Sequence, residues 1–374
     1  MLTSELGIRL LLWTGSTIPT PPKPAVTEAL THVQVTNDED SGDGFQLTFA
    51  LGRDKATDWD LLDGSLAPMT RVLIAVVLGV IPEVLIHGII TQHSVTPSNE
   101  PGRSTLTVTG TNLTVMLDLE EKNQPYANQP DFVIVGQLLA AYPQYGLLPA
   151  VAPTTDFPIE LQRIPRQTET DLACIRRLAT DNGFVFYTEP LTFGVNKAYW
   201  GPVIRAGLPQ PALTMNMGAA TNTTSLSFNN DALAPVAASG SFIEPFSKTT
   251  IPIPAVPPLR IPPLALQPAT AYRTTLLRDM GNEDAAQAAL SVAAAATSAP
   301  EAVSGNGQLE TVKYGAVLRA RRLVGVRGTG FSYDGVYYVK SVTHQIGRGS
   351  YTQSFRLSRD GTGSLLPILP ALPA

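Results

Sequence analysis

The sequence predicts a mainly β fold with α+β insertions. Short apolar or alternating segments, separated by clusters of turn-forming residues, run through residues 6–110 and are typical of antiparallel strands. Between about residues 113 and 190 helical patterns appear beside short strands. Strand patterns return after residue 309, following a proline-rich stretch and an alanine-rich stretch. The chain therefore combines two β regions with a small α/β region between them.

The first β region contains six expected strands, at residues 7–13, 31–36, 44–51, 70–78, 84–94 and 104–109. The breaks at 18–22, 37–44 and 97–102 are rich in Pro, Gly, Asn, Asp and Ser, which end strands. Six strands joined by such turns make a small barrel or sandwich.

Two helices are expected in the middle region. Residues 131–142 place Phe132, Val135 and Leu138 on one apolar stripe before Pro143 ends the helix. In the second helix, Thr168–Asp171 has capping-box spacing, and Asn182 and Gly183 supply a left-handed C-terminal turn. An aromatic strand, Phe184–Tyr187, follows directly.

The second helix also carries polar residues opposite its apolar stripe. Asp171, Arg176 and Arg177 are expected on a solvated or subunit-facing surface. Cys174, the single cysteine, lies in the same helix without an evident neighbouring base, so it is interpreted as a packing residue.

The segment 234–267 is dense in proline, and Ile251–Pro263 is expected to be extended polyproline II backbone because proline cannot donate ladder hydrogen bonds. It is either a strap against a neighbouring subunit or a semi-rigid connector. A helix is predicted at 282–297 from its alanine run. The apolar, proline-rich tail 365–374 is expected to dock on a partner.

Three strands are expected after that helix, at residues 315–320, 335–345 and 349–359. The last two are joined by the glycine-rich turn 346–349, which is typical of a hairpin.

Composition narrows the classes of function. Hydrophobic residues make up 44% of the 374 residues and charged residues only 15%, so the folded surfaces are poor in charge and suited to contacts with other subunits. The net charge of −5 and the lack of any long Lys or Arg run argue against specific nucleic-acid binding.

No membrane anchor or export signal is expected. The longest apolar stretch, Val72–Ile81, is about half of the roughly 20 residues that a membrane-spanning helix needs, and it reads as a buried strand. The N-terminal residues lack the features of a secretory signal.

Common signatures of catalysis are missing, and no catalytic, cofactor-binding or metal-binding residue is predicted. His87 and His93 come closest to a ligand pair, but a spacing of six on a strand is weak evidence for a metal. A glycosidase needs only two carboxylates brought together by the fold. Its candidates are Glu120, Glu121 and Asp131, although the first two more often mark a solvated loop.

Three passages carry a resemblance to a known family. The helix-to-strand run Thr170–Tyr187 resembles the corresponding passage of phage late control D proteins and of VgrG-type spikes of type VI secretion. The stretches Gly335–Ile346 and Tyr351–Arg359 resemble the last hairpin of that family, and Val84–Ile90 with Ser104–Gly110 resembles the end of its first barrel.

The resemblance implies two tandem tube-like β-barrel domains plus a small α/β middle region. The implied divisions are a first barrel at 1–112, an α/β region at 113–190, a second barrel at 191–233 and 309–361, a proline-rich insertion with an alanine-rich helix at 234–308, and a tail at 362–374.

The implied function is that of a non-enzymatic hub in a phage tail or contractile injection baseplate, made in the bacterial cytoplasm and located in the virion or the assembled particle. Three copies would form a ring joining a sixfold tail tube to a threefold spike. The implied partners are the tube or tube-initiator protein, a separate spike protein and baseplate wedge proteins.

Two other readings stay open. A baseplate-associated cell-wall hydrolase would require a cleft with ionisable groups of perturbed pKa. A carbohydrate-binding β-sandwich would require exposed aromatic residues.

Overall fold

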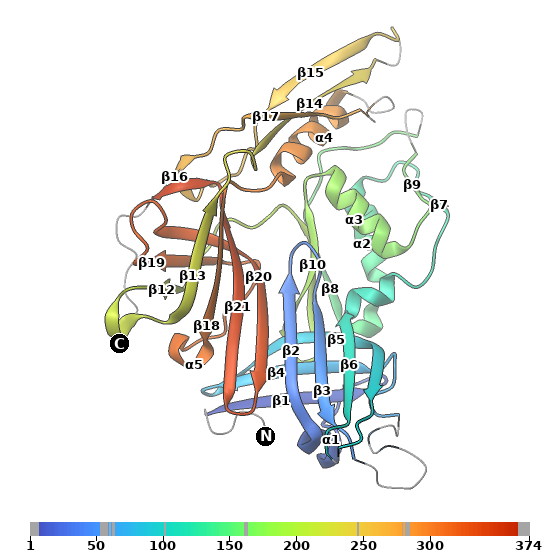
Figure 1. The fold of residues 1–374 in the computed structure, drawn as a ribbon. Coiled ribbons are helices and arrows are strands. Elements are labelled where there is room, and N and C mark those ends of the chain that lie inside the picture. Colours follow the sequence, from blue (N-terminus) through green and yellow to red (C-terminus); the bar gives the residue numbers. More distant parts are fainter. Residues whose placement is uncertain are drawn as a thin grey trace.

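The computed structural model describes residues 7–52, 59, 61, 64–100, 102–160, 164–244, 247–278, 280 and 285–365. Its main element is a twelve-stranded sheet that runs through two β halves (Figure 1). Four smaller sheets and the longer helices lie beside and above this sheet in the view of Figure 1. The predicted mainly β class is confirmed.

The first half contains all six predicted strands. In their order across the sheet they are β1 (Ile8–Gly15), β4 (Arg71–Leu78), β5 (Ile81–Thr96), β6 (Thr105–Asn112), β3 (Gly44–Ala50) and β2 (Leu30–Asp38). The N-terminal part of β5 pairs with β4 and its C-terminal part with β6, with a register shift between Ile90 and Gln92. The sheet therefore folds over one core, in which Val33, Phe49 and Val72 are fully buried. A short helix, α1 (Pro24–Ala29), adds Val26 to that core.

The second half is built on β20 (Gly335–Gly347), β21 (Ser350–Arg359), β18 (Val303–Glu310) and β13 (Thr223–Asn230), with β19 (Leu323–Arg327) and β12 (Gln210–Thr214) attached through β20. Its separate core contains Leu318, Val324 and Tyr337. The helix α5 (Thr311–Tyr314) follows β18. The predicted strands at 335–345 and 349–359 are present, and β18 begins before the expected domain boundary at residue 309.

The strand expected at 315–320 is wrong. Gly315, at φ 77°, ends α5 in a left-handed turn, and the following residues form a loop whose backbone is held by side chains instead of a strand ladder. The amide of Leu318 donates to Gln353 Oε1 at 2.9 Å, and the amide of Arg319 donates to Gln210 Oε1 at 2.8 Å. The apolar run 316–318 thus belongs to a loop, in which Val317 and Leu318 are buried.

The α/β region packs helices against a three-stranded sheet. It comprises the 3-10 helices η2 (Leu113–Leu117) and η3 (Pro143–Tyr145), helices α2 (Asp131–Ala140) and α3 (Asp171–Asp181), strands β8 (Leu147–Val151), β10 (Val185–Thr192) and β11 (Val195–Gly201), and the short pair β7 (Gln124–Pro125) and β9 (Arg166–Gln167). Trp200 is fully buried in its core, and its Nε1 donates to the Ile175 carbonyl at 3.1 Å.

Both predicted helices of this region are present, with one correction. Thr170, not Thr168, caps α3: its hydroxyl accepts from the Ala173 amide at 3.2 Å. At the other end Gly183 has φ 66°, as the predicted left-handed turn requires.

The proline-rich insertion contains a strand where polyproline II was expected. β15 (Thr250–Val256) pairs with β14 (Val236–Ile243), which also pairs with β17 (Arg273–Leu276). β15 is an edge strand of this small sheet, and an edge tolerates proline because one side of the strand needs no donor. The alanine run forms helix α4 (Ala285–Ser298), as predicted, and α4 packs on this sheet. The sheet and α4 lie at the top of Figure 1.

The remaining elements close the second half. β16 (Ala265–Pro268) pairs with β22 (Gly361–Ser364), and η4 (Gly218–Ala220) precedes β13. Nine residues of the apolar tail, 366–374, lie outside the described residues, so its expected docking is not tested. No helix within the described ranges is long and apolar enough to cross a membrane.

Two glycines allow the close packing in the first half. A Cβ at Gly110 would lie 2.2 Å from the Ile89 carbonyl oxygen and 2.4 Å from Phe45 Cζ. A Cβ at Gly88 would lie 2.3 Å from the Thr111 oxygen. The Phe45 ring therefore packs directly on the backbone of β5 and β6.

We predict that Gly110→Ala destabilises the chain by about 1–3 kcal/mol, because the added methyl group overpacks Phe45 and the β5 backbone. The matched control is Gly136→Ala in α2, where a Cβ meets nothing within 4 Å and helix propensity predicts a gain of up to about 1 kcal/mol. Urea denaturation measures both, and equal effects of the two substitutions would contradict this packing.

Candidate functional site: an arginine joint between the parts of the fold

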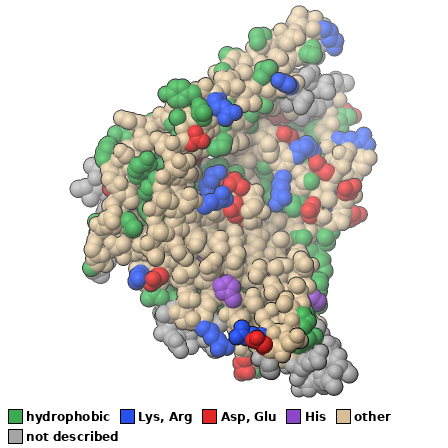
Figure 2. Space-filling model, in the orientation of Figure 1, with side chains coloured by type: hydrophobic (Ala, Val, Ile, Leu, Met, Phe, Trp, Pro, Cys, Tyr) green, Lys and Arg blue, Asp and Glu red, His purple; other side chains and the backbone are tan. Residues whose placement is uncertain are grey.

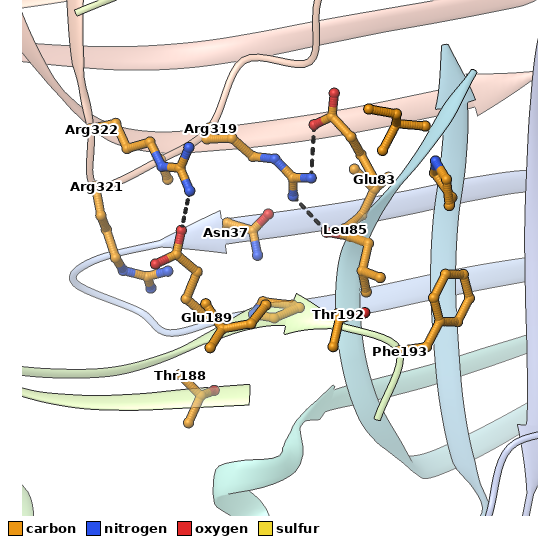
Figure 3. A pocket seen from close by; sticks show the side chains of 16 residues that line it. Asn37, Glu83, Leu85, Thr188, Glu189, Thr192, Phe193, Arg319, Arg321 and Arg322 are labelled. Carbon is orange, nitrogen blue, oxygen red and sulfur yellow. Dashed lines mark hydrogen bonds and ion pairs between the residues drawn. The ribbon is translucent and has the colours of Figure 1, made fainter. Parts of the chain in front are cut away.

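A pocket of about 380 Å³ lies where the two β halves and the α/β region meet (Figure 3). The start of β5, the end of β10 with its turn, and the loop 319–322 before β19 line it. Arginines from the loop point toward carboxylates of the other elements. The pocket is therefore polar and built from segments that are distant in sequence.

Arg319 connects the loop to the first half. Its Nη2 lies 2.9 Å from Glu83 Oε2, and its Nη1 donates to the Val84 carbonyl at 2.6 Å. Gln210 holds the backbone of Arg319 on both sides, because its side chain accepts from the amide and donates to the carbonyl. These hydrogen bonds fix the backbone of Arg319, from which its side chain extends to β5.

Arg321 makes the most buried contact. Its Nη2 lies 2.7 Å from Asp43 Oδ1 and its Nη1 3.2 Å from Asp43 Oδ2, in a two-pronged pair whose side chains are 9% and 2% exposed. The guanidinium also lies 4.7 Å from the centre of the Tyr187 ring. Burial alone would lower the pKa of Arg321, but the Asp43 carboxylate outweighs it and raises that pKa. The cation is therefore retained inside the protein.

Arg322 connects the loop to the α/β region. Its Nη2 lies 2.6 Å from Glu189 Oε1, and Lys197 Nζ lies 2.9 Å from Glu189 Oε2. A further pair, Arg356 Nη2 to Asp38 Oδ2 at 2.6 Å, joins β21 to the end of β2. We use the name arginine joint for Arg319, Arg321 and Arg322 with their partners Glu83, Asp43 and Glu189.

The arginine joint is suited to holding parts together and poorly suited to proton transfer. Burial would raise the pKa of Glu189, yet hydrogen bonds from Lys197 and Arg322 lower it below its usual range. A carboxyl that acts as a general acid near neutral pH needs a raised pKa. Glu83, Asp43 and Glu189 are each occupied by an arginine, so none is free to act as a base.

Asp171 lies where the sequence did not predict it. The expected solvated surface is wrong for this residue, which is fully buried at the first turn of α3. Its carboxylate accepts from Lys122 Nζ at 2.6 Å, Gln167 Nε2 at 2.7 Å and Tyr142 Oη at 2.7 Å. Burial raises the pKa of Asp171, but these hydrogen bonds outweigh it, and the net shift is downward.

The other polar residues of α3 are near the surface. Arg176 is exposed, and Arg177 lies 2.8 Å from Glu169 Oε1. Cys174 is buried in the core between the helices. Burial raises the pKa of its thiol to about 11, which disfavours the reactive thiolate.

The two histidines considered as a ligand pair, His87 and His93, lie in different environments. His87 is buried, its ring Nδ1 lies 3.0 Å from Asn196 Nδ2, and burial lowers its pKa to about 4. His93 is exposed. No group of three or more His, Cys, Asp or Glu that could hold a metal occurs in the part of the chain that the structure describes.

The candidate hydrolase carboxylates lie in different environments. Glu120 and Glu121 are exposed in the segment before β7. Asp131 is buried at the start of α2, where it accepts from Asn182 Nδ2 at 2.7 Å. The sequence reading missed the arginine joint, although three arginines within residues 319–322 of a charge-poor chain were a signal.

The fold is shared with solved tail proteins, although the sequence matches no protein-family model and no curated protein. A tail protein from Neisseria meningitidis MC58 is similar with a TM-score of 0.62 at 14% identity, over 95% of this chain and 98% of that one. The 43 kDa tail protein of prophage MuSo2 from Shewanella oneidensis gives 0.62 at 14% identity, over 95% and 99%.

A third similar structure belongs to a secretion system. The Escherichia coli c3393 protein, described as a component of the type VI secretion system with structural similarity to the T4 tail proteins gp27 and gp5, gives a TM-score of 0.55 at 14% identity. That match covers 88% of this chain and 73% of the other. The resemblance found in the sequence is therefore confirmed at the level of the fold.

We predict that Arg321→Ala lowers the free energy of unfolding by about 3–5 kcal/mol, because it leaves Asp43 buried without its cation. The control is Arg103→Ala, whose partner Glu100 lies 2.6 Å away in a pair with side chains 76% and 69% exposed. That change should cost at most about 1 kcal/mol. Similar losses for both variants in urea denaturation would rule out Arg321 as a structural connection.

We predict that Asp171→Asn removes part of the acid sensitivity of the fold. Because the folded-state pKa of Asp171 is lowered, ionised Asp171 stabilises the protein above the unfolded pKa of about 4, and this contribution is lost as pH falls through the folded value. The variant should be less stable at pH 7 and should lose less stability on acidification. Exposed Glu121→Gln is the control, and parallel pH curves for Asp171→Asn and the unmodified chain would contradict this role.

Proposed function

We propose that this protein is the structural hub of a phage tail or phage-tail-like contractile injection baseplate, in which three copies form a ring. The ring would join a sixfold tail tube to a threefold spike. The fold match to tail proteins over 95% of the chain carries this proposal. The arginine joint supports it, since the most elaborate polar cluster connects parts of the chain and offers no free acid or base.

The two β halves supply the physical reason for a ring of three. Each half has its own core, and we interpret the halves as two tube-like barrel domains. In the single chain the strand pairing of the described residues leaves β1, β12 and β13 as edge strands and closes no barrel. Three chains with two such domains each would present six similar units to a sixfold tube and three whole chains to a spike.

The surface suits permanent contact with other proteins. Charged side chains are sparse on the face in Figure 2, where they form small groups near the middle, on the right-hand side and at the lower edge. Val80 is 92% exposed and Leu208 97% exposed, which places large apolar groups in water in the isolated chain. Ile81, next to Val80, is 75% exposed, and neighbouring exposed apolar groups favour burial against partners. We assign these partners as further copies, a tube or tube-initiator protein, a separate spike protein and baseplate wedge proteins.

The proposal includes the expected division of the chain at residues 112, 190, 233, 308 and 361, a location in the virion or assembled particle after synthesis in the bacterial cytoplasm, and a mechanical role without catalysis. The cell-wall hydrolase is the second candidate, because the pocket brings two carboxylates, Glu83 and Glu189, to one cavity. It would require both to leave the arginines that hold them, Arg319 and Arg322.

We predict that the purified chain has three times its single-chain mass of 39.8 kDa in light scattering. The hydrolase alternative predicts a monomer that releases soluble fragments from purified peptidoglycan. Loss of that release in Glu189→Gln, with retention in Glu121→Gln, would establish the enzyme and overturn the hub.

A further inference from the structure

The small sheet of the insertion has two outer edges that differ in their capacity for hydrogen bonds. Its strand order is β15–β14–β17, and α4 packs on one of its faces at the top of Figure 1. Along an extended strand, the N–H and C=O groups of successive residues point alternately to the two sides of the strand. The hydrogen bonds that β14 makes in the middle of the sheet therefore show which backbone groups of β15 and β17 point outward.

The outer edge of β15 is closed by proline and by a bulge. The amide of Glu244, which follows β14, donates to the Thr249 carbonyl at 3.0 Å. Thr249 thus points toward β14, and by alternation Ile251 does the same while Pro252 points outward and offers no N–H. Pro254 follows at a shift in the β14–β15 register. Proline and bulges are two means by which natural sheets prevent pairing at an edge.

The outer edge of β17 is open. The amide of Leu277, directly after β17, donates to the Ser239 carbonyl at 2.8 Å, so by alternation Thr275 also points toward β14. Thr274 and Leu276 therefore direct their N–H and C=O groups outward. β17 pairs with β14 residue for residue, all four of its residues are exposed, and β14 is its one neighbour among the described strands. Such an edge can accept a further strand.

The side chains of β17 define the chemistry of a matching strand. Leu277 packs against the core between this sheet and α4, so Arg273 and Thr275 share its face, where Arg273 is exposed. Tyr272 and Leu276 belong to the opposite face and are 72% and 56% exposed. Side chains that share a face on adjacent strands contact each other. A fourth strand would therefore place apolar groups beside Tyr272 and Leu276, and a carboxylate beside Arg273 would complement its charge.

We propose that the outer edge of β17 binds an extended segment of a partner protein in which apolar and acidic residues alternate. The backbone of that segment hydrogen-bonds to Thr274 and Leu276. Its apolar side chains pack beside Tyr272 and Leu276, and one of its carboxylates pairs with Arg273. The backbone bonds supply affinity and the side chains supply selectivity. The edge lies within one chain, so the proposal does not rest on the ring or on the proposed function.

The test measures fluorescence anisotropy of the full chain with two labelled peptides. One is fluorescein–Gly-Val-Glu-Val-Glu-Val-Gly-amide, and the other has Lys at both Glu positions. The Glu peptide should bind about fivefold or more tightly at low salt, because attraction to Arg273 becomes repulsion in the Lys peptide. The net charge of −5 would favour the Lys peptide in nonspecific binding. Equal binding of the two, or no binding of the Glu peptide up to its solubility limit, overturns the proposal.

Two matched proline variants locate the binding. Thr274→Pro removes one outward N–H of β17 and keeps its bonds to β14, and an edge strand tolerates proline at such a position. It should weaken binding of the Glu peptide about tenfold or more. Thr250→Pro makes the same change at the outer edge of β15 and should leave binding unchanged. Circular dichroism shows whether each variant is folded. Unchanged binding to folded Thr274→Pro, or equal losses in both variants, overturns the site.

Arg273→Glu tests the edge even if Thr274→Pro does not fold. It should reverse the preference, so that the Lys peptide binds more tightly than the Glu peptide, and an unchanged preference overturns the proposal. Two other occupants have their own signatures. A lower mass in solution for Thr274→Pro than for the unmodified chain would assign the edge to a second copy. A gain in peptide affinity of about tenfold on removal of residues 366–374 would assign it to that segment. Either result overturns the proposal.

Discussion

The pairing of β20 holds the two β halves in one sheet, and the other parts are placed around that pairing. On one side β20 pairs with β19 over Gly335–Tyr338 and then with β2 over Ser341–Ile346. Its other side pairs with β21 over most of its length. A single strand therefore belongs to the second half and completes the first, whose core it enters through Ile346.

The arginine joint, in the loop before β19, also connects the two β halves. Arg321 holds Asp43, which follows β2, Arg319 holds the start of β5, and Arg322 holds β10. Replacing a buried ion pair with apolar residues is often neutral or stabilising, so such pairs are weak evidence for stability. The geometry of these ion pairs explains their presence better than stability does. An arginine that contacts a carboxylate through two nitrogen atoms, as Arg321 contacts Asp43, permits one relative placement of the two segments. A fixed placement of the two halves is what a ring of three chains requires, since an angular error in each chain would prevent closure.

Sequence patterns predicted most strands and helices, because the spacing of apolar residues within one segment determines which of its faces is buried. The six strands of the first half follow alternation between turn clusters, and α3 was marked by its stripe and its Asn182–Gly183 end. The hairpin around His344 was also found by resemblance; in the structure this histidine is buried and lies 2.9 Å from the hydroxyl of Tyr351. The failures depended on tertiary context. Gln353 and Gln210 turn residues 315–320 into a loop, and an edge position lets Ile251–Val256 pair as a strand despite two prolines.

The polar sites were hidden from the sequence for the same reason. Asp171 can be buried as a charged group because Lys122, which lies 49 residues earlier in the sequence, donates a hydrogen bond to its carboxylate. Arg319, Arg321 and Arg322 lie within four residues of one another, but their acid partners come from three separate segments. No local pattern could assign them.

We propose that three chains place six similar β units around one axis. Cryo-electron microscopy of the purified assembly would show this arrangement. We expect a ring with a central opening and six lobes that obey only threefold symmetry, with the β20 pairing inside each chain. A compact monomer, or a ring whose lobes obey a true sixfold axis with one lobe per chain, would contradict it.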